Sequence, residues 1–189
     1  MRTIKQPKMK TLLLAITVLT SVGVYAQQNA QVPNDKSVVY FVRASSAGSL
    51  INFTYLDSNK VIGKFNGRKY FRYECKPGYH LFWAKSENRD FIEADLIAGK
   101  TYFIEAVPVM GAFKAGVQLY PINPNTSNRM KRINKLLLKR SPEEYSPNKL
   151  EEWTNYWNEL IKASLIRFNK RKAVGKEKKV LNSNFYLNK

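Results

Sequence analysis

Residues 69–85 read KYFRYECKPGYHLFWAK, and this stretch decides the fold. Two runs rich in aromatic residues, 69–75 and 79–84, are separated by Lys76-Pro77-Gly78, where Pro fixes φ and Gly tolerates either sign. The stretch therefore predicts a strand, a turn and a second strand. The second run is largely apolar on both faces, which predicts a central strand covered on both sides. Its two faces are Tyr79, Leu81 and Trp83, and His80, Phe82 and Ala84.

The same pattern of strand-forming runs and turns continues on both sides of this stretch, over residues 37–122. Short runs of β-branched and aromatic residues alternate with turn signals, among them Asn66-Gly67, which suits a two-residue hairpin because both central positions need positive φ. With no helical pattern between the runs, this favours an antiparallel sandwich or barrel. We expect a mainly β protein with an antiparallel β-sandwich of about 7–8 strands, immunoglobulin-like in kind. The expected strands are 38–43, 51–56, 61–65, 69–75, 79–84, 91–96, 101–107 and 117–120.

The pattern changes after Tyr120, because the Pro and Asn residues of 121–125 cannot continue a strand. Apolar residues at helical spacing then predict a helix over 129–140 and a longer one from 147 to about 172, which Ser146-Pro147 can start. We therefore expect two C-terminal α-helices after the sandwich. The apolar face of the longer helix is Leu150, Trp153, Trp157, Leu160, Ile161, Leu165 and Phe168.

Residues 1–26 have the parts of a secretory signal peptide, in order: a basic start, an apolar core and the small-x-small site Val24-Tyr25-Ala26. The apolar core is shorter than the roughly 20 residues of a spanning helix, so a retained anchor is the weaker alternative. A start at Met9 in place of Met1 leaves the mature chain unchanged. We expect a periplasmic or secreted protein with no transmembrane helix in the mature chain. The expected parts are a signal peptide (1–26), a flexible lead-in (27–36), the β-sandwich (37–122) and a basic α-helical extension (123–189).

Positive charge gathers in the C-terminal part. The chain has 32 Lys and Arg and 14 Asp and Glu, a net charge of +18, and residues 123–189 hold 16 of those basic and 6 of those acidic residues. A basic amphipathic helix can lie on an anionic membrane or lipopolysaccharide surface, although a solvated face packed on the sandwich is the simpler account. Export disfavours nucleic acid as the partner. The residues expected to bind an anionic surface are Trp153, Trp157, Lys162, Arg167, Lys170, Arg171 and Lys172.

Few residues are suited to catalysis. The chain has one histidine, His80, and one cysteine, Cys75, which excludes an intramolecular disulfide and leaves any Cys–His pair without an evident third member. Cys75 falls on the apolar side of a predicted strand, so we expect a buried thiol. Glu93 and Asp95 point the same way from one predicted strand and could be the acid and base of a hydrolase, although a solvated face accounts for them as well. We expect no catalytic residue, cofactor or metal.

Three short motifs, in this order, resemble a bacterial envelope family catalogued as a domain of unknown function, number twenty-eight forty-six. They are Val39-Tyr40-Phe41-Val42-Arg43, Pro77-Gly78-Tyr79-His80 and Gly99-Lys100-Thr101-Tyr102-Phe103. The match covers about residues 37–122. The resemblance implies an exported β-domain, often a lipoprotein, but this chain has Phe103 where a second Tyr is usual and lacks the lipobox Cys. The Pro-Gly-x-His turn also resembles that of surface-layer and transthyretin-like sandwich modules.

The resemblance implies architecture and location and carries over no catalytic residue. We expect a structural cluster shared by Tyr40, Arg43, His80 and Tyr102 that fixes the strand order. The function expected is a non-enzymatic, exported envelope module whose partner is another envelope protein or an anionic envelope surface. A carboxylate-dependent hydrolase is the remaining alternative.

Overall fold

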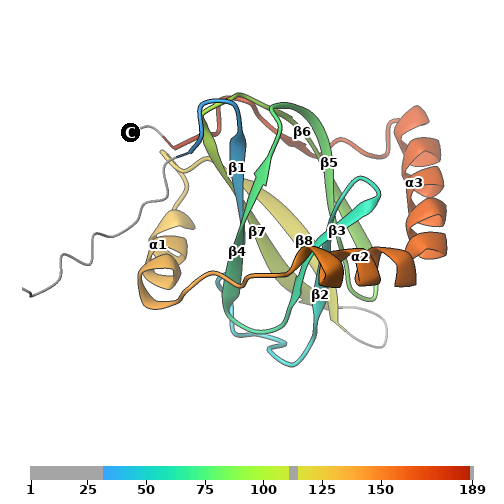
Figure 1. Ribbon diagram of the computed structural model, residues 1–189, viewed down its shortest axis with the longest axis horizontal. Helices are drawn as coiled ribbons and strands as arrows, with labels where there is room; N and C mark the ends of the chain where they lie inside the picture. Colours follow the sequence, from blue (N-terminus) through green and yellow to red (C-terminus); the bar gives the residue numbers. More distant parts are fainter. Residues whose placement is uncertain (1–31, 111–114, 188–189) are drawn as a thin grey trace, which may run out of the picture. The chain divides into compact units, whose positions relative to one another are not determined.

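Nine strands and three helices form within residues 32–110 and 115–187, the part of the chain that this computed structural model describes (Figure 1). The expected signal peptide and residues 27–31 of the lead-in lie outside the described residues. In chain order the elements are β1 (Ser37–Arg43), β2 (Phe53–Asp57), β3 (Lys60–Phe65), β4 (Lys69–Cys75), β5 (Gly78–Lys85), β6 (Arg89–Leu96), β7 (Thr101–Met110), β8 (Ala115–Ile122), α1 (Met130–Lys139), α2 (Pro147–Tyr156), α3 (Asn158–Ala173) and β9 (Val180–Leu181).

The strands form two sheets, in the orders β4-β1-β7-β8 and β3-β2-β5-β6-β9. This arrangement confirms the expected mainly β sandwich followed by C-terminal helices. Most neighbours are antiparallel, as expected, but β1 pairs with β7 and β6 pairs with β9 in parallel. After β1 the chain forms β2 and β3 in the other sheet and then returns as β4, which pairs with one edge of β1. After β5 and β6 it returns again as β7, which pairs with the other edge, so β1 lies between β4 and β7.

The core lies between the sheets and consists of side chains that alternate along each strand. Phe41 and Phe71 stack at 4.9 Å between ring centroids, and Phe82 from the facing sheet meets Phe41 edge-on at 5.3 Å. Cys75 is buried in this core, as expected. The prediction that residues 79–84 form a central strand is also confirmed, since Ala84 faces the inner core and Trp83 packs beneath the C-terminal helices.

Asn66-Gly67 does not close a hairpin, which corrects the sequence expectation. Gly67 has the positive φ that such a turn requires, +65°. However, β3 and β4, on either side of it, belong to different sheets. Asn66 does not have the positive φ that the first central position of such a turn needs. Packing of the two strands into opposite layers decides what this turn connects.

The helices pack on the two outer faces of the sandwich (Figure 1). From α1, Met130, Ile133 and Leu136 are buried against the sheet that contains β1. α3 buries Ile161 and Phe168 against the sheet that contains β5. The extension is thus joined to the sandwich, and the described residues make one compact unit.

The long helix expected over 147–172 is two helices, so the extension has three helices where two were expected. Trp157 lies at the break with φ −96° and ψ 5°, and Figure 1 shows α2 and α3 running in different directions. α2 follows the edge strand β3, where Thr154 Oγ1 accepts a hydrogen bond of 3.0 Å from the Val61 amide. Residues on both sides of the break pack in one apolar cluster against the sheet that contains β5.

Both ends of the described chain are bound to the sandwich. Residues 33–36 form a turn, and the carbonyl of Lys36 accepts a 2.7 Å hydrogen bond from Gly99, so this part of the expected lead-in is tied to the β6–β7 connection. At the other end β9 pairs with β6, and Leu181 is fully buried in the core. Among the described residues, no helix has the length and apolar character needed to cross a membrane.

Candidate anion-binding site

Arg43 is fully buried at the end of β1 and holds the β1–β2 connection. Its guanidinium donates hydrogen bonds to the carbonyl oxygens of Ile51 (2.6 Å), Ala47 (2.9 Å) and Gly48. It also lies 4.1 Å from the centre of the Phe53 ring. Burial lowers the pKa of Arg43. The planar guanidinium can donate to several carbonyl oxygens at once, so Arg43 fixes the conformation of this connection.

His80 lies in β5 and has an acceptor at each ring nitrogen. Nδ1 is 2.7 Å from Asp57 Oδ2, and Nε2 is 2.8 Å from the carbonyl oxygen of Lys76. Burial lowers the pKa of His80, but the hydrogen bonds with Asp57, Cys75 and Lys76 outweigh it and raise the pKa to about 10. A ring with acceptors on both sides is stable as the imidazolium. His80 therefore serves as a cation that joins β2 to the Lys76 turn.

Tyr102 and Tyr40 occupy two further, separate places. The Tyr102 hydroxyl accepts a hydrogen bond from the Ile97 amide (3.1 Å) and donates to the Ser183 carbonyl (2.9 Å). Tyr40 is on the outer side of β1, where its ring stacks on Phe103 at 5.2 Å in the cluster beneath α1.

The four residues therefore do not form the shared cluster that the sequence predicts. Tyr40 lies on the outer face of β1, because neighbouring positions of a strand alternate between its faces. Arg43, His80 and Tyr102 lie on the inner side of their strands but at separate places, since Tyr102 pairs with Val39, at the other end of β1 from Arg43. Arg43, His80 and Tyr102 have one role in common: each folds its polar end back onto the carbonyl or amide groups of a connection. These three side chains therefore stabilise connections, whereas the backbone hydrogen bonds between strands set the strand order.

Glu93 and Asp95 have different surroundings. The Glu93 carboxylate accepts a 2.8 Å hydrogen bond from the Tyr79 hydroxyl and forms an ion pair with Lys172. Burial raises the pKa of Glu93, but the hydrogen bonds from Lys172 and Tyr79 bring it below its usual value. Asp95 is exposed. A lowered pKa is the opposite of what a general acid needs at neutral pH.

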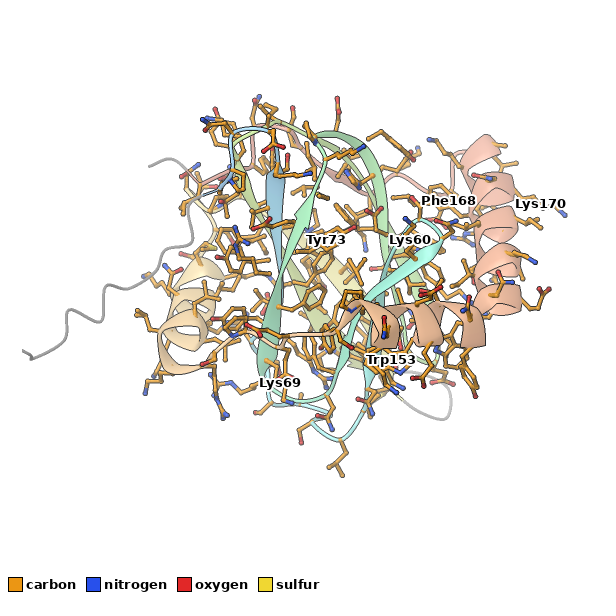
Figure 2. All side chains as sticks on the ribbon, in the orientation of Figure 1. Lys60, Lys69, Tyr73, Trp153, Phe168 and Lys170 are labelled. Carbon is orange, nitrogen blue, oxygen red and sulfur yellow. The ribbon has the colours of Figure 1, made fainter. Side chains whose placement is uncertain are left out.

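The side chains expected to bind an anionic surface divide into two groups. Trp153 and Trp157 are half-buried against the sheet, and Lys64 and Lys85 lie over their rings, so both rings contribute to the packing of the helices. The five cations are exposed on α3, and Figure 2 shows Lys170 pointing away from the sandwich while Phe168 points toward it. Three of these cations have acidic partners among the described residues: Lys162 with Glu159, Arg171 with Glu177 and Lys172 with Glu93.

A second dense group of cations lies on α1 and the residues that flank it, which the sequence analysis did not single out. Residues 129–140 contain six Lys or Arg and no acidic residue, and this count is the signal that could have identified it. A buried carboxylate on β7, Glu105, provides local compensation. Its Oε2 accepts a 2.6 Å hydrogen bond from Arg129, and its Oε1 lies 3.7 Å from Arg132.

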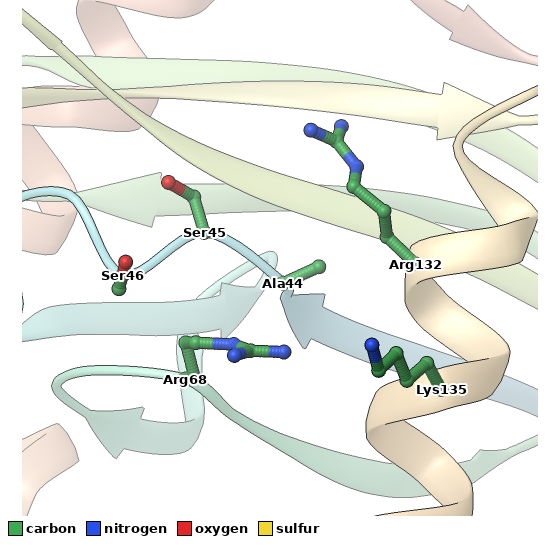
Figure 3. A pocket seen from close by; sticks show the side chains of 6 residues that line it. All are labelled: Ala44, Ser45, Ser46, Arg68, Arg132 and Lys135. Atoms are coloured by element: carbon green, nitrogen blue, oxygen red, sulfur yellow. The ribbon is translucent and has the colours of Figure 1, made fainter.

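Beside α1 is an open hollow of about 300 Å³. Three segments line it: Ala44, Ser45 and Ser46 from the β1–β2 connection, Arg68 from the β3–β4 turn, and Arg132 and Lys135 from α1 (Figure 3). We call these residues the basic hollow. Figure 3 shows the ends of Arg68 and Lys135 turned toward each other below Ala44. The lining holds three cations, two hydroxyl groups and no carboxylate, a set of groups that suits an anionic ligand.

Within residues 32–110 and 115–187, no three His, Cys, Asp or Glu side chains gather as a metal site. No protein-family model and no curated protein matches this chain. The resemblance described above therefore stays a prediction that rests on its three motifs.

Proposed function

We propose that this protein is an exported, non-catalytic module of the cell envelope that binds an anionic partner. The supporting observation is that His80 is bonded on both sides. His80, Cys75 and Asp57 are the groups nearest to a nucleophile, base and orienting acid in this chain. A general base must begin the reaction unprotonated, whereas each ring nitrogen of His80 has its own acceptor and the raised pKa keeps both ring protons in place at neutral pH.

Cys75 supports the same proposal from the other member of the pair. The residue is 6% exposed and lies in the core among aromatic side chains, with Sγ 3.7 Å from the Ser37 carbonyl oxygen. A nucleophilic thiol needs access for a substrate and an environment that stabilises the thiolate. Burial of Cys75 leaves a substrate no access to the thiol.

The chemical part of the proposal is tested by the ionisation and access of these two residues. Imidazole resonances of His80 followed by NMR should remain those of the cation through pH 8, and Cys75 should react with iodoacetamide at neutral pH only when the protein is unfolded. A His80 titration near pH 6.5 together with rapid alkylation of the native thiol would contradict the proposal.

Export is tested by expressing the full chain with a C-terminal tag and measuring its mass and location. We expect a product that begins at Gln27 in the periplasm or medium. A matched variant with Leu12→Arg and Leu14→Arg disrupts the apolar core of the leader and should stay in the cytosol at full length. Full-length wild-type protein in the cytosol would refute export.

A second candidate function is peripheral binding of an anionic membrane or lipopolysaccharide through the outer face of α3. It is favoured by Arg167 and Lys170, which are exposed and for which no acidic partner is formed within the described residues. Vesicles with anionic lipid should bind the wild-type protein in a salt-sensitive way. Binding should fall in Arg167→Glu/Lys170→Glu and persist in Lys131→Glu/Lys139→Glu, the same charge change on α1. Equal losses in both variants would refute a role specific to α3.

A further inference from the structure

We propose that the basic hollow is a binding site for a phosphate group carried as a phosphomonoester or as free phosphate. The inference deepens the proposed function and rests on it only in taking the partner to be anionic. The hollow brings together residues from three segments, of which Arg68 and Lys135 are 67 positions apart in the sequence. None of its lining residues is acidic.

The chemistry of the lining matches a tetrahedral anion with several oxygens. Arg68 and Arg132 each offer a planar fork that can donate two parallel hydrogen bonds to one phosphate, and Lys135 adds a compact positive charge. Ser45 and Ser46 supply hydroxyl donors at the wall opposite α1. A volume of about 300 Å³ lies at the lower end of small-ligand sites, so it suits a phosphate and the first atoms attached to it.

The wall that holds the two serines is built in advance by Arg43. Its bonds to Ala47, Gly48 and Ile51 close the β1–β2 connection, and the Ala47 amide donates a 3.2 Å hydrogen bond to Ser45 Oγ. Gly48 has φ +57° in the bend that results. A loop that is already ordered loses little conformational entropy when a ligand binds.

Glu105 interacts differently with the two arginines nearest to it, Arg129 and Arg132. The carboxylate is buried and bonds Arg129 closely, while Arg132 is 3.7 Å from its other oxygen and has 62% of its side chain exposed. Oε1 of Glu105 has no hydrogen-bond partner among the described residues. Glu105 therefore attracts Arg132 without accepting a hydrogen bond from it, and the Arg132 guanidinium can still donate to an anion in the basic hollow.

Inorganic phosphate, added at constant ionic strength with chloride as the balancing anion, is the first probe. Its binding is followed through the amide NMR signals of Ser45 and Ser46. We expect saturable shifts in the wild type and an apparent Kd at least tenfold higher in Arg68→Ala/Lys135→Ala, since each lost charged hydrogen bond has an effect of this order. Both residues are exposed, so the variant should keep its fold.

The matched control is Lys176→Ala/Lys178→Ala, which removes the same charge from two exposed residues after α3. Its apparent Kd for phosphate should stay within twofold of the wild type. Equal weakening in both variants would mean that general attraction, and not this site, holds the anion. Shifts that fail to saturate would also overturn the proposal.

Vesicles distinguish a lipid headgroup from a soluble compound. Phosphatidic acid presents a phosphomonoester and phosphatidylglycerol a phosphodiester, each diluted in phosphatidylcholine. If the wild-type protein prefers phosphatidic acid and Arg68→Ala/Lys135→Ala removes that preference, the ligand is a lipid. If the protein binds phosphate without preferring phosphatidic acid, the ligand is a soluble compound. If phosphate does not bind while the protein still reaches the envelope and associates with it, this site is refuted and the proposed function stands.

Discussion

Asp57 and His80 are joined across neighbouring strands β2 and β5 by a contact of 2.7 Å between Oδ2 and Nδ1. The Tyr73 hydroxyl donates to the same carboxylate oxygen at 3.0 Å, so one acid serves two partners. Burial and the nearby Asp57 raise the pKa of Tyr73, which keeps its hydroxyl a donor. The three side chains join the two sheets at this end of the sandwich.

The first prediction concerns the pH dependence of stability. His80 has a pKa of about 10 in the folded protein and about 6.5 when unfolded, so its contribution is fully present below pH 6.5 and is lost as pH rises through 10. Asp57→Asn should lower the free energy of unfolding by about 2 kcal/mol at pH 6. Urea unfolding should show this difference from wild type shrinking by pH 10. Asp95→Asn, which changes an exposed carboxylate, is the control. If the free energies of unfolding of wild type and Asp57→Asn differ by the same amount from pH 6 to 10, the prediction is contradicted.

The second prediction concerns Gly63 in β3. A Cβ atom at this position would lie 2.8 Å from Cε1 of the Phe71 ring, which is packed in the core. Gly63→Ala should therefore lower the free energy of unfolding by about 1–3 kcal/mol, because the ring has no space to move. Gly63→Ala/Phe71→Leu should cost less than the sum of the two single changes in a double-mutant cycle. Strict additivity would show that the contact is not the cause.

The third prediction concerns Arg43. Arg43→Met removes the donors that the carbonyl groups of residues 47, 48 and 51 share, and should lower the free energy of unfolding by about 3 kcal/mol. Hydrogen exchange should accelerate over residues 45–52 more than elsewhere. Arg68→Met removes an exposed Arg nearby and should change stability by no more than about 0.5 kcal/mol. Similar effects of the two substitutions would argue against a loop-holding role for Arg43.

The fourth prediction tests the docking of α3. Phe168 is 3% exposed and its ring lies 4.9 Å from that of Phe91. Phe168→Ala should lower the free energy of unfolding by about 3–5 kcal/mol. Ile166→Ala is the control on the same helix, because Ile166 is 57% exposed and should have an effect below about 1 kcal/mol. If the sandwich unfolds at the same denaturant concentration in both variants, α3 does not stabilise it.

Periodicity in the sequence determined strands β1 to β8, the helical segments of the extension and the burial of Cys75, but not β9, which forms in the extension by pairing with β6. These features depend on the alternation of neighbouring side chains, which a period of two or 3.6 residues records locally. The two-sided cover of β5 could be predicted for the same reason, since both faces of 79–84 are largely apolar.

Tertiary structure decided the features that join distant segments. The parallel pairing of β1 with β7, the crossing of Asn66-Gly67 between sheets and the break at Trp157 follow from how whole layers pack, which no local pattern contains. The same holds for the partners of polar groups. Asp57 reaches His80, and Arg68 meets Lys135 beside Ser45, because the fold brings together residues whose spacing in the chain has no period.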